Sequence, residues 1–357
     1  MAAILITGGA GFIGSNFVRY WRKKAPNDAI IVLDALTYAG NPANLFEVPG
    51  VTLVKGDIRD TQMVTGLLSA HGADRIVHFA AETHVDRSIS GPDAFISTNI
   101  DGTHSLLKAA RSVWLDQNSG RPHRFHHVST DEVYGALEYE DPAFREDHPY
   151  QPNSPYAASK AASDHLVRAY NRTYGLQTTI SNCSNNYGPF QYPEKLIPFF
   201  ILNALHGQPL PIYGDGLQIR DWLHVDDHCH GIGCILDHGE IGECYNIGGG
   251  EELPNLTVIN AICSVIDAAF AADPDLARRF PDAPSAQGRL TADLKNYVTD
   301  RPGHDRRYAI DDSKIRKALG YHPGHDFTAG FTQCLRWYLD NEAWWRPLWT
   351  PAEPELR

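Results

Sequence analysis

The sequence predicts an α/β protein with a Rossmann-type, doubly wound parallel sheet and a smaller, mixed α/β lobe. Three observations predict it: β-rich runs alternate with amphipathic helices, a glycine-rich turn directly follows the first run, and the regular alternation ends near residue 183. Near-continuous apolar strands separated by helices are typical of a parallel sheet that is covered on both faces. The 357 residues, 43% of them hydrophobic, suffice for one large domain that carries a second lobe.

The expected strands and helices follow one another in order along the first half of the chain. We expect strands at residues 3–7, 30–33, 51–55, 75–79, 124–129 and 178–182. We expect helices at residues 13–24, 61–70, 92–111 and 156–174. Beyond them, segments 219–236 and 243–247 are expected core elements, and 271–292 is rich in Ala, Asp, Pro and Arg, which predicts a solvated insertion.

Charge and cysteine usage narrow the class of protein. A formal net charge of −12 has the wrong sign for a nucleic-acid partner. The six cysteines include no C-x-x-C pair and do not resemble the framework of a small secreted domain. No charged leader and no long apolar stretch is evident, so we expect a cytoplasmic protein with no membrane partner.

A glycine-rich turn between the first strand and the first helix predicts a dinucleotide site. Gly8, Gly11 and Gly14 let the backbone approach a pyrophosphate, and Phe12 and Ile13 begin the helix whose N-terminus favours the anion. An ordinary βα turn is the alternative, but Asp34 ends the second strand 20 residues past Gly14. A carboxylate there accepts hydrogen bonds from a ribose 2′-hydroxyl and repels a 2′-phosphate, so NAD is favoured over NADP.

Further cofactor contacts are expected where the next strands end, although each of these residues could be a mere strand end. They are Ala35, Leu36 and Thr37 after the second strand, Asp57 and Ile58 after the third, and Ala80, Ala81, Glu82 and Thr83 after the fourth.

Tyr156 and Lys160 stand four residues apart, on one face of the predicted helix. A neighbouring ammonium stabilises phenolate, so Lys160 is expected to lower the pKa of Tyr156 from about 10 toward a range where it removes a proton from an alcohol. The alternative is a surface i,i+4 pair.

The fifth strand ends in Ser129-Thr130-Asp131-Glu132, and here the sequence resembles a known family. The glycine turn, this strand end and Tyr-x-x-x-Lys resemble the extended short-chain dehydrogenases/reductases, and Thr130-Asp131-Glu132 resembles their sugar-nucleotide 4,6-dehydratases. Further motifs make the resemblance more specific: the sequence resembles the dTDP-glucose 4,6-dehydratase family from about residue 3 to residue 346. The further motifs that carry it lie at 84–88, 184–189, 193–198, 211–214, 219–222 and 300–305.

The resemblance implies a lyase of deoxysugar biosynthesis. It would convert dTDP-glucose to dTDP-4-keto-6-deoxyglucose and water, with NAD regenerated at each turnover. It implies Tyr156 as base at the C4 hydroxyl, Glu132 as base at C5, Asp131 as acid for the leaving hydroxyl, Thr130 as a hydrogen-bonding partner at O4, and Lys160 as the group that tunes Tyr156. It also implies a homodimer joined through the helices near 92–111 and 156–174.

The resemblance also assigns ligand contacts. Those to NAD are Thr98, Tyr156, Lys160 and Asn186. Those to the nucleotide sugar are Thr83, His84, Thr130, Asp131, Glu132, Asn185, Lys195, Leu196, Pro211, Tyr213, Arg220, Asn255, Arg301 and His304. The implied domains are an NAD-binding Rossmann domain of 1–182, 219–248 and 307–320, and a nucleotide-sugar-binding lobe of 183–218, 249–306 and 321–357.

The roles of the two acids also follow from electrostatics. Like charges in one low-dielectric pocket disfavour double ionisation, so Asp131 is expected to stay protonated beside an ionised Glu132. Adjacent strand residues point to opposite faces, so both acids reach one pocket only if the chain leaves strand geometry after Thr130, and Gly135 permits a bend nearby. Alternatively, the acids simply occupy the first turn of a helix.

Other functions stay open at this point. They are a 4,6-dehydratase for another nucleotide base, an NAD-dependent nucleotide-sugar 4-epimerase, and a catalytically dead NAD-binding sensor. A histidine-rich segment, His224, Asp226, Asp227, His228 and His230, suggests a metal site, but no known ligand spacing is completed and we expect no metal. We expect these histidines to pack between the lobes and the tryptophans near 337–349 to form a core edge.

Overall fold

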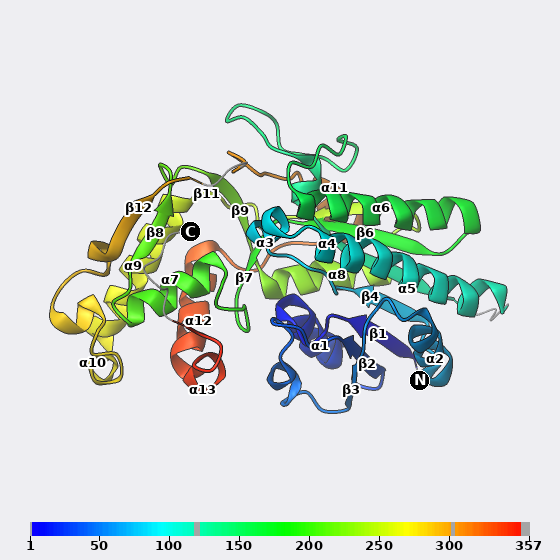
Figure 1. Ribbon diagram of the computed structural model, residues 1–357, viewed down its shortest axis with the longest axis horizontal. Helices are drawn as coiled ribbons and strands as arrows, with labels where there is room; N and C mark the ends of the chain where they lie inside the picture. The colour runs from blue at the N-terminus through cyan, green and yellow to red at the C-terminus, as the bar shows by residue number, and fades with distance from the viewer. Residues whose placement is uncertain (1, 118–121, 301–303, 351–357) are drawn as a thin grey trace.

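Seven parallel strands form the large sheet of the computed structural model, which describes residues 2–117, 122–300 and 304–350 (Figure 1). Their order is β10-β6-β5-β4-β1-β2-β3, and every neighbouring pair is parallel. The strands are β1 (Ala3–Thr7), β2 (Ala29–Asp34), β3 (Val51–Lys55), β4 (Arg75–His78), β5 (Arg124–Thr130), β6 (Thr178–Cys183) and β10 (Cys244–Ile247). The six strands predicted from the sequence are confirmed, and the strand order reverses beside β1, where parallel sheets bind ligands.

Helices cover both faces of this sheet. The helices are α1 (Phe12–Lys24), α2 (Thr61–His71), α5 (Gly102–Arg111), α6 (Pro155–Tyr174) and α8 (Val225–His238). Alternate residues of β1 point to opposite sides, so Ile4 and Ile6 pack with α1 and α8, whereas Leu5 packs with α2, α5 and α6. The predicted doubly wound fold is therefore confirmed.

One predicted helix has an unexpected interior. Residues 92–111 form α4 (Asp93–Phe95), then a π-helical segment (Ile96–Asp101), then α5. A second π-helical segment (Ser112–Asp116) continues the rod. Periodicity of apolar residues does not distinguish these hydrogen-bond patterns, and π-helical turns are frequent at functional sites.

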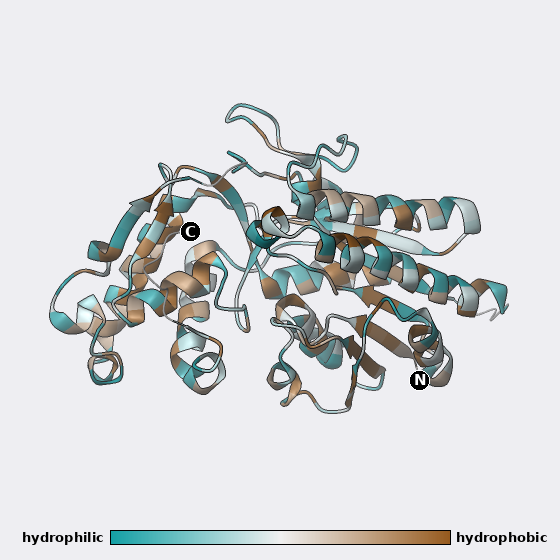
Figure 2. Ribbon diagram, viewed as in Figure 1, coloured by the Kyte–Doolittle hydropathy of each residue, from teal (hydrophilic) through white to brown (hydrophobic). Residues whose placement is uncertain are grey.

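A second core lies in the part of the molecule that Figure 1 shows on the left. It has a three-stranded sheet of β7 (Asn185–Tyr187), β9 (Ile219–His224) and β11 (Glu252–Pro254), and a pair of β8 (Leu210–Tyr213) and β12 (Lys295–Val298). Around them pack α7 (Leu196–Leu205), α9 (Asn255–Ala272), α10 (Asp275–Arg279), α12 (Phe327–Asp340) and α13 (Glu342–Trp345). Figure 2 shows the hydrophobic residues of α7 and α9 gathered in this core. The expected smaller, mixed α/β lobe is present.

The segment 219–248 joins both parts. β9 pairs with β7 and β11, whereas α8 packs on α1 and β10 extends the large sheet. The short helices α3 (Val85–Ser90) and α11 (Ser313–Leu319) complete the fold. The limits of the two lobes stay a proposal, with β9 at their junction.

The prediction that residues 271–292 form a solvated insertion is wrong. This segment contains α10 and two 3-10 turns (Pro284–Gln287 and Thr291–Leu294). Leu276, Phe280 and Ala283 are buried in the second core, and the amide and hydroxyl of Thr291 bind Asp267 of α9. Because the segment is mostly polar in composition, the prediction overlooked three spaced apolar residues that are buried in the second core.

The helix α9 is long and apolar enough to cross a membrane by length and composition. In this fold its buried residues, among them Val258, Ile262 and Ile266, lie in the second core together with the tryptophan cluster around Trp345. We therefore interpret α9 as a core helix.

Candidate active site

In the turn from β1 to α1, neighbouring backbone segments pack too closely to leave room for side chains at two of the glycines. Gly8 has a φ of +68°, and a side chain there would meet the amide of Ala80 at 2.6 Å. A side chain at Gly14 would lie 2.2 Å from the carbonyl oxygen of Gly8. Gly11 begins α1 without a side-chain cap, so the helix N-terminus keeps the free amides that a pyrophosphate needs. The structure thus provides a cradle that fits a dinucleotide.

Asp34 holds this turn to the loop that follows β2. Its carboxylate accepts the amides of Ala10 (Oδ2, 2.9 Å) and Leu36 (Oδ1, 2.8 Å), and Leu36 itself adopts a φ of 53°. Burial raises the pKa of Asp34, and the two amides oppose that rise. Ala35 and Thr37 flank Leu36 in the same loop. One carboxylate therefore fixes two of the predicted cofactor segments at once.

Exchange of Asp34 for Asn should weaken NAD binding at least tenfold. The amide group of Asn replaces one acceptor oxygen, so a buried backbone amide loses its partner at a cost of about 1–3 kcal/mol. Titration calorimetry with NAD measures the change. Asp28→Asn, just before the other end of β2, is the matched control and should bind as the wild type does; equal affinity in all three proteins would contradict the assignment.

The loop that follows β4 is held in place by an asparagine that was not predicted from the sequence. Asn99, in the π-helical segment, accepts the amide of Glu82 (2.8 Å) and donates to its carbonyl (3.0 Å) and to Ser159 of α6 (2.8 Å). The loop with Ala80, Ala81 and Thr83 is thereby tied to the helix that carries Tyr156. Thr98 is the neighbour of Asn99.

The end of β3 lies farther out in the sheet. Asp57 there is paired with Arg59 (2.5 Å) and half-exposed, whereas Ile58 is buried under Gly102 of α5. This position at the sheet edge is compatible with the adenine contact expected for it.

The chain leaves strand geometry at Thr130. β5 ends there, and a 3-10 turn (Asp131–Tyr134) begins, capped by the Thr130 hydroxyl, which accepts the amide of Glu132 at 3.3 Å. Gly135 closes the turn with a φ of +97°. The predicted departure from the strand is confirmed, and the two acids also occupy a helical first turn, so both interpretations were right about the backbone.

The surroundings of Asp131 favour its neutral, protonated form. Its residue is 2% exposed, its Oδ1 accepts the Thr130 hydroxyl at 3.3 Å, and its Oδ2 has no hydrogen-bond partner in the described ranges. Burial raises its pKa well above the usual range, the charges of Glu132 and Asp221 raise it further, and Arg220 opposes them. The expected protonated Asp131 agrees with this environment.

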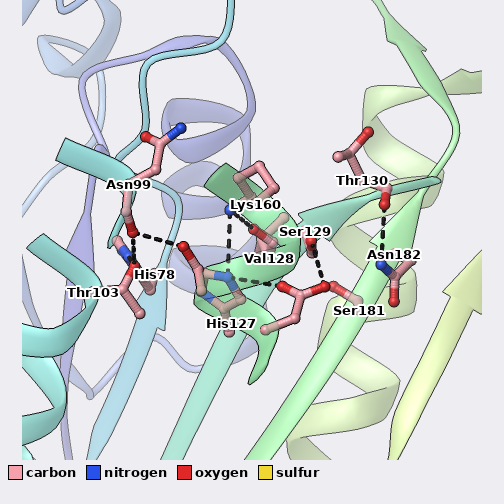
Figure 3. Close-up of polar contacts among 12 residues, drawn as sticks. His78, Asn99, Thr103, His127, Val128, Ser129, Thr130, Lys160, Ser181 and Asn182 are labelled. Atoms are coloured by element: carbon pink, nitrogen blue, oxygen red, sulfur yellow. Dashed lines mark hydrogen bonds and ion pairs between the residues drawn. The ribbon is translucent and has the colours of Figure 1, made fainter. Parts of the chain in front are cut away.

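Tyr156 lies beside these acids, but its electrostatics differ from the prediction. Burial raises its pKa well above 10, the charge of Glu132 adds to the rise, and a hydrogen bond with Thr130 opposes it. The Lys160 ammonium donates instead to the carbonyl of Val128 (2.8 Å) and lies 3.4 Å from His127 Nε2 (Figure 3). The predicted lowering of the Tyr156 pKa is wrong for this arrangement, because burial outweighs the i+4 neighbour.

The predicted substrate residues at the start of α7 and in the loop after β4 lie in contact with one another. Lys195, which precedes α7 and its first residue Leu196, donates to the carbonyl of Thr83 at 3.3 Å. His84 Nε2 lies 3.6 Å from the carboxylate of Glu194. The loop after β4 and the entry to α7 therefore form one wall.

Arg220 stands on β9 next to the catalytic turn. It donates to the carbonyls of Ile219 (2.7 Å) and Asp305 (3.0 Å), and its guanidinium lies 4.3 Å from the ring centre of Tyr308. Its charge reaches Asp131, whose pKa it lowers. A buried cation thus lies near the acid pair.

Of the remaining predicted substrate residues, His304 contacts Asp300 directly, whereas Tyr213 and Asn255 are linked to Asp300 through His304 and Gln218. His304 Nδ1 lies 2.6 Å from its carboxylate, and the ring of Tyr213, two residues beyond Pro211 on β8, lies edge-on to His304 at 6.3 Å. Gln218 donates to Asp300 (2.9 Å) and accepts the amide of Asn255 (2.9 Å), whose buried Oδ1 has no partner in the described chain. Arg301 lies outside the described residues.

Asn185 and Asn186 form β7, and the Asn186 side chain pairs with His228 Nδ1 at 2.9 Å. His224 and His325 stack, with ring centres 4.1 Å apart and planes inclined by 26°. The possible ligand atoms of His224, Asp226 and His325 lie within 4.8 Å of one another, a spacing that a metal ion could bridge. The prediction of no metal stays a prediction.

The comparison with known proteins decides the family. The GDP-mannose 4,6 dehydratase family matches residues 5–334. The dTDP-glucose 4,6-dehydratase of Xanthomonas campestris pv. campestris (strain B100) is 51% identical, covering 96% of this chain and 95% of the relative. The corresponding protein of Neisseria meningitidis serogroup B is 50% identical over 97% of this chain and 96% of its own. The chain belongs to the dTDP-glucose 4,6-dehydratase family.

Solved structures agree with this family and its cofactor. The dTDP-glucose 4,6-dehydratase DesIV of Streptomyces venezuelae, with NAD bound, has a TM-score of 0.85 and 47% identity, covering 97% of this chain and all of the other. A UDP-glucose 4-epimerase of Thermotoga maritima has a TM-score of 0.81 at 25% identity, covering 95% of this chain and 99% of its own. A dTDP-glucose 4,6-dehydratase and a UDP-glucose 4-epimerase thus share this scaffold, so the fold by itself does not distinguish the two activities.

Proposed function

We propose that this protein is a dTDP-glucose 4,6-dehydratase that converts dTDP-glucose to dTDP-4-keto-6-deoxyglucose and water. The observation that carries the proposal is the buried, unpartnered Oδ2 of Asp131 beside Glu132, Thr130 and Tyr156. A 4-epimerase needs the tyrosine but no acid and base next to C5 and C6. The names of the curated relatives support the same activity.

The chemistry requires four proton transfers, three by the time water leaves and one that returns a proton to C5. Bound NAD supplies the oxidising and reducing capacity at the sugar ring, so that no external reductant is consumed. Tyr156, hydrogen-bonded to Thr130, takes the proton of the C4 hydroxyl as that carbon is oxidised. It does so as the phenolate, which is the minor form while burial raises the pKa of Tyr156. The resulting ketone acidifies C5–H, whose proton passes to the Glu132 carboxylate. The C6–O bond breaks as Asp131 donates its proton, and the hydroxyl leaves as water. The hydrogen removed from C4 returns to C6, and Glu132 returns its proton to C5, which completes the 4-keto-6-deoxy product.

Most of the residues proposed to contact NAD lie at the carboxyl ends of β1 to β4, and the others come from the π-helical segment, α6 and β7. They are Gly8, Gly11, Phe12, Ile13, Gly14, Asp34, Ala35, Leu36, Thr37, Asp57, Ile58, Ala80, Ala81, Glu82, Thr83, Thr98, Tyr156, Lys160 and Asn186.

The residues proposed to contact the nucleotide sugar come from the loop after β4, the catalytic turn and the second core. They are Thr83, His84, Thr130, Asp131, Glu132, Asn185, Lys195, Leu196, Pro211, Tyr213, Arg220, Asn255, Arg301 and His304. Lys195 and Arg220 supply positive charge for the diphosphate.

Mass spectrometry of the product tests the function. Purified protein with NAD is incubated with dTDP-glucose, UDP-glucose and GDP-mannose in separate reactions. A product lighter by one water from dTDP-glucose is expected. An isomer of unchanged mass would instead establish an epimerase, and binding without turnover a sensor.

We further propose a cytoplasmic homodimer joined through α5 and α6. The two helices contact each other, and their outer residues His104, Lys108, His165 and Ala169 are exposed. Light scattering during size-exclusion chromatography should give twice the chain mass of 39.6 kDa. A single-chain mass would contradict the dimer.

A further inference from the structure

Three histidines are buried in the central sheet, and one of them has unlike partners. His78 lies between the hydroxyls of Thr7 (2.8 Å) and Thr103 (2.9 Å). His126 likewise lies between the hydroxyls of Thr179 (3.0 Å) and Ser181 (3.1 Å). These two rings are satisfied by neutral groups and need no charged neighbour.

His127 stands instead between an ammonium and a carboxylate. Its Nε2 lies 3.4 Å from Lys160 Nζ (Figure 3) and 3.2 Å from Asp164 Oδ1. Neither His127 Nδ1 nor Asp164 Oδ1 has a hydrogen-bond partner in the described chain, so His127 and Asp164 are in close contact without a hydrogen bond. The side chains of His127 and Asp164 are both 0% exposed. Solvent therefore cannot screen the interaction between Lys160 and Asp164 across this ring.

The other oxygen of Asp164 is already occupied. Oδ2 accepts the hydroxyls of Ser129 (2.9 Å) and Tyr150 (3.0 Å), which fixes the carboxylate with Oδ1 toward His127. Asp164 also lies one helical turn beyond Lys160 on α6, so that both residues share one buried face. A fully buried carboxylate is costly unless a cation balances it, and Lys160 is the cation that this face offers.

We propose that Asp164 is a positioning residue that acts through His127 to keep the Lys160 ammonium charged and held against the end of β5. The inference rests on the proposed function, in which Lys160 serves Tyr156. The catalytic lysine would thus depend on a fully buried carboxylate that lies on the far side of His127.

The charges around Lys160 agree with this assignment. Burial lowers the pKa of Lys160 to about 8, and Asp164 is the first group that opposes the fall, followed by the Cys183 thiol on β6. Burial also lowers the pKa of His127 and His78, so both rings stay neutral near pH 7. Burial raises the pKa of Asp164, and Lys160 is the first group that opposes this rise. The other titratable groups that interact with Asp164 are Tyr134, Tyr150, Arg168 and Cys244.

Direct titration of Lys160 tests the pair. Each variant is pulsed with acetic anhydride at a series of pH values, and the acetylated Lys160 peptide is quantified by mass spectrometry. Because Asp164 raises the pKa of Lys160, Asp164→Asn should move the midpoint of labelling down by about one pH unit. Asp164→Glu, which restores a carboxylate, should move it back toward the wild-type value.

The matched control is Thr103→Val, which removes a neutral partner from His78 and should leave the midpoint where it is. If Asp164→Asn does not fold, His127→Asn removes the ring between the two charges and should shift the midpoint in the same direction. An unshifted midpoint in a folded Asp164→Asn or His127→Asn protein would overturn the proposal.

Activity gives a second readout. The single-turnover rate of C4 oxidation in a Glu132→Gln background separates this step from proton donation by Asp131. In Asp164→Asn the alkaline limb of the pH profile of this rate should shift to lower pH by the same increment as the labelling midpoint. A merely structural role would instead lower the rate equally at every pH. Failure of the wild type to dehydrate dTDP-glucose would refute the proposed function but leave the labelling result to decide on Asp164.

Discussion

Exchange of Glu132 for Gln is expected to stop the reaction after oxidation at C4, so that the absorbance of reduced nicotinamide accumulates. The amide has nearly the shape of the carboxylate but cannot take the C5 proton, and loss of a positioned base costs about 10²–10⁴ in rate. Turnover to the 4-keto-6-deoxy product should fall by that factor, while dTDP-glucose still binds. Rapid-mixing absorbance and product mass, measured on the same samples, separate the two steps.

Glu146→Gln provides the control for this experiment. Glu146 is also half-buried, but it accepts the amide of Asn246 at the edge of the large sheet, away from β5 and the acid pair. This variant should turn over at a rate close to that of the wild type and accumulate no reduced nicotinamide. Equal loss of oxidation and elimination in Glu132→Gln would contradict the role of Glu132 as the C5 base.

The larger sheet could be predicted because each of its strands is recognisable from its local sequence. Parallel strands buried on both faces, such as β1 and β2, are near-continuous apolar runs. The strands β7 and β11 have three residues each, too few for a periodic pattern, and they are stabilised by pairing with β9, which is distant in sequence. Such strands exist because of tertiary contacts, and local sequence does not reveal them.

The same distinction applies to the site. The glycine turn and the Thr130-Asp131-Glu132 triplet are contiguous, and the structure gives them the backbone geometry that their chemistry requires. Asn99 and His127 act on groups far along the chain, and only the pairing of strands and helices brings them there. Asp164 did carry a local signal, since it stands four residues after Lys160, but a second i,i+4 neighbour is common on any helix.

The pKa of Tyr156 shows why spacing alone misleads. The sequence contains a lysine at i+4 and says nothing of how far the phenol is removed from water. In the folded protein burial dominates, and the ammonium of Lys160 is engaged by Val128 and His127. A sequence pattern can therefore name the catalytic pair but not the direction in which its environment shifts the pKa.

Exchange of Asp131 for Asn is expected to slow loss of water by about 10²–10⁴, since hydroxide is a poor leaving group without a proton donor. Burial and the neighbouring charge of Glu132 raise the pKa of Asp131, which favours the protonated carboxyl that this step needs. A substrate whose C6 carries fluorine needs less help from an acid. We therefore expect the rate ratio of wild type to Asp131→Asn to be much smaller for the 6-fluoro analogue than for dTDP-glucose. Parallel turnover assays with both substrates measure this ratio. Equal ratios would show that Asp131 acts on binding or on another step, because only proton donation to the leaving group depends on what leaves.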